Sequence, residues 1–461
     1  MQTTGSILHG DPIAPVILGV TTVLAFAVIG RVAARKLGQP TVLGELLMGI
    51  LLGNIAWYLG VDLIAILREG PRVFDLVDQV LAGSPINQVA VDLFGETKGL
   101  ELARIISGPN GGEVMQVAHT VDVFSRYGVI FLLFMVGLDT NLDEMASVAK
   151  DSIRVAVIGV VMPVLLGYSV VVLIRPDMTL YSGIFIAATL AATSIGISAN
   201  VLEEMGRTRS REGRIILGAA VGDDILGLIL LAIISGIVVS GSVNVVGVST
   251  IVMVSLLFLV AVIKLGPAIV RAAANIMSRL DIVEAKMFTS YLFVMVLAWL
   301  ANLSGLATII GAFAAGIILS DSFFSHSDKS HDGRVYSIRE LIMPLEVILV
   351  PIFFILMGIQ VKVEAFLSWP VMTLAGGLIV AAVVGKIVSG FGARSTADKL
   401  VVGIGMLPRG EVGLVFAAIG RAIGVIDDSI FAAIVVMVFV TTLAAPPWLK
   451  IALNRQSAKR A

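Results

Sequence analysis

Windows of about 20 mostly apolar residues, the length that an α-helix needs to cross about 30 Å of hydrocarbon, recur along the whole chain. The chain is 57% hydrophobic and only 14% charged, which is far from the composition of a soluble protein of 461 residues. These windows predict an all-α polytopic membrane protein with about thirteen transmembrane helices. A count of twelve stays open, because only "NLSG" separates the eighth and ninth windows. The windows cover residues 12-30, 41-61, 125-143, 152-174, 179-202, 215-240, 246-270, 284-303, 305-321, 341-361, 369-391, 399-421 and 427-449.

The basic residues test this arrangement, because cytoplasmic loops of membrane proteins accumulate Lys and Arg. With the N-terminus outside, 22 of the 32 Lys and Arg residues fall on the inner side. Eight fall outside, and five of these lie in or at the end of one long loop, about 61-122. We therefore expect the N-terminus outside and the C-terminus in the cytoplasm.

The overall charge and the cysteine content exclude several classes of function. A formal net charge of -1 gives no reason to expect a nucleic acid or another polyanion as a partner. The chain has no cysteine, so disulfides, thiol chemistry and Cys-ligated metals are excluded.

Two pairs of segments repeat within the chain, which in transporters locates the substrate site at the interface of the copies. "LGELLMGILLGN" resembles "IGAFAAGIILSD" 267 residues later, and "FLLFMVGLDTNL" resembles "IFFILMGIQVKV" 221 residues later. The long loop accounts for the difference between the two offsets. Matching windows are seven apart, an odd number, so the copies face opposite ways. The matches set Gly44 against Gly311, Gly49 against Gly316 and Gly137 against Gly358.

This inverted repeat divides the chain into parts. We expect an additional first helix at 12-30, a first repeat at 41-240 with the external insertion at about 61-122, and a second repeat at 305-449. All of them belong to one transmembrane transporter domain, 1-461.

An inverted repeat predicts one interrupted helix in each copy near the middle of the membrane. The fifth window carries "ATSIGISAN", whose hydroxyl residues and glycine weaken a helix. The twelfth carries "GMLPRGEVG", where Pro408 removes a helical hydrogen bond and two charges, Arg409 and Glu411, lie in apolar sequence. A harmless kink is the alternative for each window taken alone.

Asp223 and Asp224 lie inside the apolar sixth window, and Asp223 falls about 12 Å from the inner surface. Successive helical residues point about 100° apart, so the two carboxylates need different surroundings. Lys386 is the only lysine within the eleventh window and can compensate one of these charges. Three readings stay open: the acids have only a structural role, Lys386 extends to the inner surface, or Lys386 pairs with either acid.

At this point the motifs resemble a known family. "VGDDILG", "TSIGIS", Lys386 and "PRGEVGLV" together resemble the bacterial sodium/proton antiporters of the monovalent cation:proton antiporter superfamily. The resemblance covers nearly the whole chain and implies two broken helices that cross beside the acids. It also implies core and dimerisation domains, a homodimer, and a place in the lipid of the bacterial inner (cell) membrane, where exchange serves sodium and pH homeostasis.

The same resemblance implies roles for individual residues. Asp224 is the principal carboxylate for Na+ and H+, and Asp223 completes the ion site and pairs with Lys386. The polar lining comes from Thr193 and Ser194. The second helix break is supported by Arg409 and Glu411.

The adjacent acids resemble the electrogenic members of the family, whereas the potassium efflux relatives typically have Gln before the Asp. The sequence therefore predicts exchange of Na+, with Li+ as a further substrate, for H+ by alternating access, with no chemical catalysis and no cofactor. Adjacent acids titrate as a coupled pair, so protons and Na+ compete for one site. A K+/H+ antiporter is the nearest alternative, and a sodium-coupled symporter of organic solutes is a more distant one. An ion channel would need a polar pore or filter, which the sequence does not show.

Overall fold

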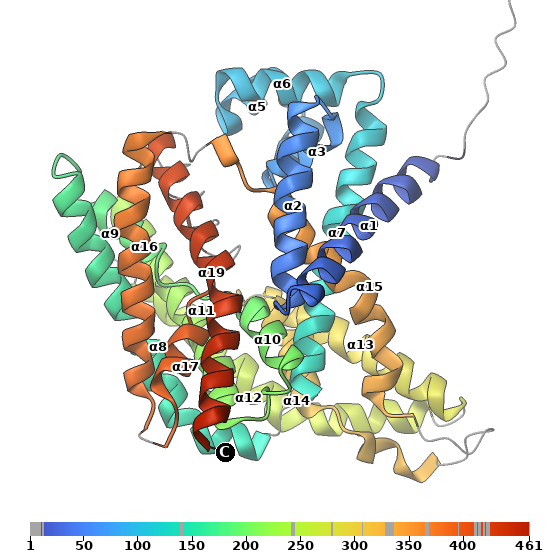
Figure 1. The fold of residues 1–461 in the computed structure, drawn as a ribbon. Helices are drawn as coiled ribbons and strands as arrows, with labels where there is room; N and C mark the ends of the chain where they lie inside the picture. The colour runs from blue at the N-terminus through green and yellow to red at the C-terminus, as the bar shows by residue number, and fades with distance from the viewer. Residues whose placement is uncertain are drawn as a thin grey trace, which may run out of the picture. The chain divides into compact units, whose positions relative to one another are not determined.

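The structure, a computed structural model, describes residues 11, 13-138, 142-240, 245-277, 280-306, 308-327, 336-364, 368-394, 396-409, 413, 416-417, 420 and 425-460. Within these ranges the regular elements are all helical (Figure 1). The long helices are α1 (Ala14–Lys36), α2 (Thr41–Tyr58), α7 (Gly111–Leu138), α8 (Leu142–Ile174), α11 (Arg211–Ser240), α12 (Val245–Ile276), α13 (Ile282–Leu303), α15 (Ile338–Ile359), α16 (Trp369–Ser389) and α19 (Asp428–Arg460). Shorter helices are α3 (Asp62–Arg68), α4 (Arg72–Leu81), α5 (Ile86–Phe94), α6 (Glu96–Ser107), α9 (Leu180–Ala188), α10 (Ile195–Glu204), α14 (Thr308–Ile318) and α17 (Lys399–Gly405), with 3-10 turns η2 (Asp321–Ser327) and η4 (Gly390–Gly392).

Nine helices within the described ranges are long and apolar enough to cross a membrane, which makes the chain an integral membrane protein. Each of the thirteen predicted windows overlaps at least one helix, while the count of thirteen crossings stays a prediction. The eighth and ninth windows form separate helices, α13 and α14. Gly305 between them has a φ of +75°, a conformation that glycine adopts readily.

The chain divides into two compact units. Unit 1 comprises Met1–Gly128 and Ile348–Lys362, and unit 2 comprises Val129–Val347 and Val363–Ala461. The divisions fall inside α7 and α15, so both helices contribute to both units.

Unit 1 contains the predicted external insertion, and this insertion is helical. Helices α4 to α6 are amphipathic, and Val73, Leu76 and Leu102 from α4 and α6 share an apolar cluster with Ile359 from the end of α15. The following helix α7 begins at Gly111, earlier than the window predicted at residue 125. The window missed this first part because polar residues such as Glu113 lower its hydropathy.

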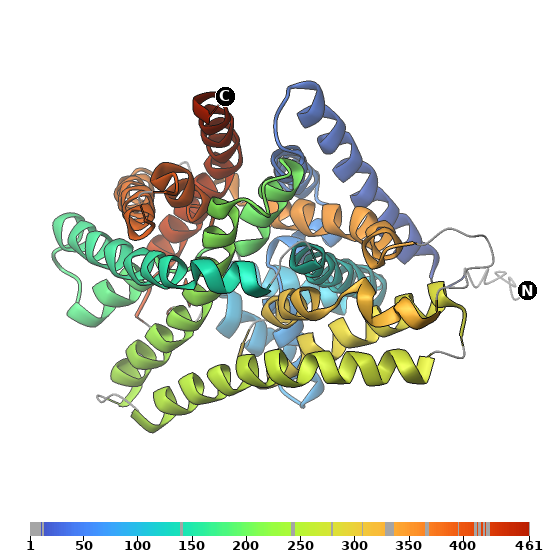
Figure 2. The same ribbon diagram turned by 90° about the horizontal axis from the view of Figure 1, so that it is seen from below.

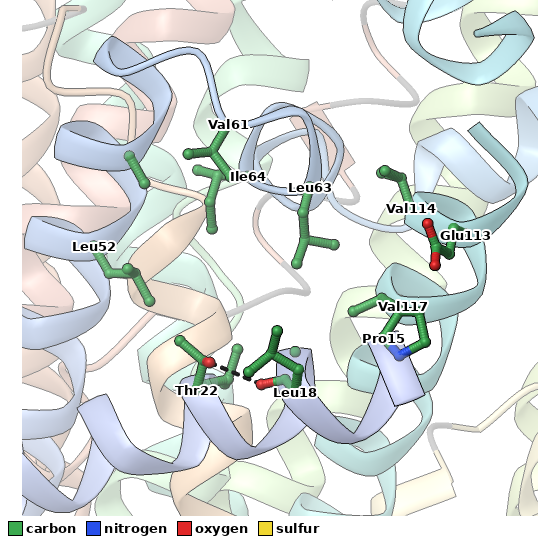
Figure 3. Close-up of a pocket in the computed structure, with 13 residues that line it drawn as sticks. Pro15, Leu18, Thr22, Leu52, Val61, Leu63, Ile64, Glu113, Val114 and Val117 are labelled. Atoms are coloured by element: carbon green, nitrogen blue, oxygen red, sulfur yellow. Dashed lines mark hydrogen bonds between the residues drawn. The ribbon is translucent and has the colours of Figure 1, made fainter. Parts of the chain in front are cut away.

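A cavity of about 410 Å³ lies within unit 1, between residues of α1, α2, α3 and α7 (Figure 3). Leu63 and Val117 are typical of its apolar lining, and Glu113 is the one charged residue among the lining residues. The Thr22 hydroxyl donates to Leu18 O at 2.7 Å within α1. This lining offers few oxygen atoms to a cation, so the cavity is not a candidate ion site.

An ion cluster joins the insertion to the end of α15 in unit 1. The Glu69 carboxylate lies 2.8 Å from Lys98 Nζ and accepts a hydrogen bond of 2.7 Å from Lys362 Nζ. Burial raises the pKa of Glu69, but the charges and hydrogen bonds of Lys362 and Lys98 outweigh this effect and hold that pKa below its ordinary value. Burial lowers the pKa of Lys362 to about 8, against the opposing attraction of Glu69.

This cluster gives a first prediction about pH. Because only the neutral amine is acylated, labelling of Lys362 by acetic anhydride should increase through a midpoint near pH 8. The attraction of Glu69 favours the ammonium form, so Glu69→Gln should move the midpoint to lower pH. Mass spectrometry of the labelled peptides measures both midpoints, with the exposed Lys36 as the reference lysine. A midpoint for Lys362 equal to that of Lys36, or one raised in Glu69→Gln, would contradict the prediction.

Close glycine contacts follow the internal repeat. A Cβ at Gly49 of α2 would lie 2.8 Å from Gly358 Cα of α15, both in unit 1. In unit 2, a Cβ at Gly137 of α7 would lie 2.9 Å from Gly316 Cα of α14. The repeat sets Gly49 against Gly316 and Gly137 against Gly358, so exchanging the copies converts one contact into the other.

A second pair of contacts shows the same correspondence. A Cβ at Gly44 would overlap Gly30 O of α1, and a Cβ at Gly311 would overlap Leu297 O of α13. Gly30 and Leu297 are 267 residues apart, as are Gly44 and Gly311. Helix α1 therefore lies against α2 as α13 lies against α14.

Candidate functional site

The first interrupted helix is α9 followed by α10, with residues 189-194 non-helical between them, as "TSIGIS" predicts. The Thr189 hydroxyl donates to Ile186 O at 2.6 Å and so satisfies a carbonyl at the end of α9. Thr193 and Ser194 are buried at the start of α10. The break therefore exposes backbone groups in the interior of unit 2.

The second interrupted helix is α17, which ends at Gly405. Residues 406-409 are non-helical, and Pro408 within them has no N–H with which to continue the helix. The residues 410-412 that follow lie outside the described part of the chain. The predicted site residue Glu411 is among these.

Hydrogen bonds connect the two breaks directly. Ser194 N donates to Pro408 O at 2.8 Å, and Ser198 Oγ donates to Gly405 O at 2.5 Å. Arg409 Nη1 donates to Ala192 O at 2.5 Å. Backbone groups released by one break are thus satisfied by the other, which allows irregular backbone inside a membrane protein.

The acid pair lies on α11 beside this crossing. Asp223 is fully buried and Asp224 is 6% exposed. The Asp223 Oδ2 atom lies 2.5 Å from Lys386 Nζ of α16 and 2.6 Å from Thr193 Oγ1. Thr193 Oγ1 also lies 3.1 Å from Met406 O, so its single proton is shared between the carboxylate and the second break.

Lys386 is as deeply buried as its partner. This position excludes the alternative in which Lys386 extends to the membrane surface. The sequence left open which acid pairs with Lys386, and in the structure Asp223 forms this ion pair.

Arg409 is fully buried and anchored at both ends. Its side chain holds Ala192 O of the first break, and its own carbonyl accepts a hydrogen bond from Thr442 Oγ1 of α19. Among the described residues, its Nε and Nη2 atoms have no hydrogen-bond partner. Arg409 therefore places a second positive charge in the interior that contains the two acids.

The structure brings six of the seven predicted site residues into one region of unit 2. These are Asp223, Asp224, Thr193, Ser194, Lys386 and Arg409. Sequence reasoning did not assign roles to Ser198 and Thr442. The signal for Ser198 was its place inside "TSIGIS", and the signal for Thr442 was a hydroxyl in an otherwise apolar window.

The described residues contain no group of three or more His, Cys, Asp or Glu side chains that could hold a resident metal ion. Two adjacent carboxylates, a hydroxyl and backbone carbonyls are nevertheless hard oxygen ligands. Their number and type suit a monovalent cation that is cargo and binds transiently.

A helical membrane protein whose two interrupted helices cross beside buried charges has the architecture of a secondary transporter. The comparisons with known proteins agree with this class. The chain belongs to the sodium/hydrogen exchanger family, whose transmembrane profile matches residues 22–455.

Two curated relatives match over most of their length. The chain is 36% identical over 446 residues to the high-affinity Na+/H+ antiporter NhaS3 of Synechocystis sp., covering 95% of this chain and 90% of the relative. It is 33% identical over 362 residues to the Na+/H+-K+ antiporter GerN of Bacillus cereus, covering 76% of this chain and 88% of the relative.

A solved structure shows the same fold. The sodium proton antiporter MjNhaP1 of Methanocaldococcus jannaschii matches with a TM-score of 0.57 at 16% identity, covering 96% of this chain and 98% of the other.

Proposed function

We propose that this protein is a secondary antiporter that exchanges Na+ for H+ across the membrane. The observation that carries the proposal is the buried carboxylate of Asp223, bound by Lys386 and Thr193 where the two breaks meet, with Asp224 next to it. The relatives NhaS3 and GerN are named as antiporters of Na+ and H+, which agrees with this proposal.

In this proposal, exchange results from competition between Na+ and H+ for the same carboxylate. Asp224 takes up either a proton or Na+, with further oxygens from Thr193, Ser194 and the carbonyls of the breaks. Asp223 keeps its charge balanced by Lys386 when the site is otherwise empty. Because bound Na+ and bound H+ exclude each other, each return of the site to the opposite face carries the other ion.

A coupled acid pair also supports electrogenic exchange. If one Na+ displaces more than one proton, each cycle moves net charge, and the membrane potential then contributes about 2.3 kcal/mol per charge per 100 mV. Lys386 and Arg409 provide the compensating positive charges within the site.

The proposed orientation has the N-terminus outside and the C-terminus in the cytoplasm, and the ion pairs support the division of the loops into two sides on which it depends. Asp151 lies 3.0 Å from Arg211 and 3.4 Å from Arg394, and all three belong to loops assigned to the inner side. Glu69 and Lys362 both belong to loops assigned to the outer side. These contacts join only segments that the positive-inside rule places together.

The proposal also includes the two repeats, at 41-240 and 305-449. It includes a homodimer as well, in the lipid of the bacterial inner membrane. The swapped glycine contacts support the repeats. A K+/H+ exchanger is the second candidate, because the relative GerN is named as an Na+/H+-K+ antiporter.

Proton flux in proteoliposomes tests the function. Addition of Na+ to wild-type protein should release protons from the lumen, with Li+ as a second substrate and K+ weaker. Clamping the membrane potential should change the rate if exchange is electrogenic. Flux driven by K+ above Na+ would favour the second candidate. If no monovalent cation drives flux at any pH, or if flux requires an organic solute, the antiporter proposal is wrong.

A further inference from the structure

Helix α8 lies between α11 and α16, as the view from below shows (Figure 2). Asp223 extends from α11 and Lys386 from α16, so the ion pair between them lies beside α8. The residue of α8 at that place is Gly159, which is buried and has no side chain.

The contacts of Gly159 differ from those of its neighbours on α8. One turn before it, the Cβ of Ala156 lies 3.0 Å from the position of a Cβ on Gly222 of α11. One turn after it, Pro163 packs against Gly385 of α16. At Ala156 and Pro163, α8 carries the larger residue and the facing helix carries a glycine. At Gly159, α8 carries the glycine and the facing helices carry the side chains.

Two of the three nearest atoms at Gly159 belong to the ion pair. A Cβ on Gly159 would lie 3.2 Å from Lys386 Nζ, 3.4 Å from Ser389 Cβ and 3.6 Å from Asp223 Oδ1. A methyl group there would press on the ammonium and cover one oxygen of the carboxylate.

Within the described part of the chain, Asp223 Oδ1 is the oxygen of this carboxylate that has no partner. Asp223 Oδ2 is occupied by Lys386 and Thr193, but Oδ1 has no hydrogen-bond partner among the residues that the structure describes. A buried carboxylate oxygen without a partner is costly and usually binds water or an ion. The bare backbone of Gly159 is what faces this atom.

We infer that Gly159 is a specificity-determining position of the cation site. Its missing side chain leaves no α8 side chain over the buried Asp223 Oδ1, so a water molecule or a partly dehydrated monovalent cation can bind this oxygen when the site opens to one face. It also lets Lys386 pack against α8 within reach of Asp223. This inference rests on the proposed function and adds that a residue of α8 controls the binding of a cation or water to Asp223.

Gly159→Ala tests the inference in full-length protein in proteoliposomes. The added methyl group removes one oxygen ligand or its bridging water, so the apparent KM for Na+ should rise about tenfold while the maximal rate is retained. The smaller Li+ should be affected less than Na+. The increase in Tm that Na+ produces in detergent should shrink in parallel, which measures binding without transport.

Gly167→Ala is the matched control on the same helix. A Cβ at Gly167 would lie 2.9 Å from Leu190 Cδ2 and contact only apolar atoms, so it crowds α8 without touching the ion pair. This variant should keep the wild-type KM and the ratio of Li+ to Na+ transport.

Two results would overturn the inference while leaving the antiporter function intact. One is a Gly159→Ala protein with the KM and cation preference of the active wild type. The other is an equal loss of rate in both glycine variants with KM unchanged, which would show a packing effect only. Absence of cation-driven flux in the wild type would instead refute the proposed function, and the inference with it.

Discussion

Asp224→Asn should abolish cation-driven proton flux in proteoliposomes while leaving the protein folded. The amide keeps the size of the side chain but has no titratable proton and no negative charge, so H+ and Na+ lose the group for which they compete. Asp224 is 6% exposed, and the amide has the same size and shape as the carboxylate, so the packing around it should be kept. We expect the rate to fall to that of protein-free vesicles at every pH.

The control for Asp224→Asn is Asp177→Asn. Asp177 forms an exposed ion pair with Arg175 at 3.2 Å, outside the site, and its loss should leave flux unchanged. Near-normal Na+-driven flux in Asp224→Asn would show that the cation is carried by another group. Gel filtration in detergent checks that each variant is folded, and gel electrophoresis of the vesicles compares the reconstituted amounts before the flux is interpreted.

Lys386→Met should destabilise the protein, because it leaves the Asp223 carboxylate buried without a cation. Removing one partner of a buried ion pair typically costs about 3 to 5 kcal/mol, since the remaining charge has lost its compensation. Asp223 Oδ2 then keeps its hydrogen bond from Thr193, which carries no charge. The Tm in detergent should therefore fall clearly below that of the wild type.

Lys386→Met combined with Asp223→Asn separates charge from packing. The double variant has no unpaired buried carboxylate, so most of the lost stability should return, although transport should not. If the double variant is as unstable as Lys386→Met alone, the lysine acts through the packing of its aliphatic chain. In that case the ion pair would not be the source of the stability.

Hydropathy predicted most of the fold, because the length of a membrane-spanning helix is set by the thickness of the bilayer. It failed at the start of α7, where Glu113 and other polar residues precede the apolar part of one continuous helix. The insertion was predicted only as an external segment. Its helices pack on one another through buried residues such as Val73 and Leu102, and no local sequence pattern specifies this packing.

The candidate site was predicted where rare residues mark it. Charges in apolar windows are costly and therefore conspicuous, and this property identified Asp223, Lys386 and Arg409. Sequence could not tell which acid pairs with Lys386, because that depends on how α11 and α16 are rotated about their axes. Gly159 carried no signal at all, since its contribution is a missing side chain next to residues far away in sequence.

The crossing of the two breaks is built largely from main-chain groups. Ala192 O, Gly405 O, Met406 O and Pro408 O accept its hydrogen bonds, and the amide of Ser194 donates one of them. No codon change deletes a carbonyl oxygen, so alanine scanning can remove the side-chain donors of Thr193, Ser198 and Arg409 but not the oxygens that accept from them. Side chains there can drift during evolution while the oxygens stay in place, and amide-to-ester replacement is the chemical tool that would reach the Ser194 amide.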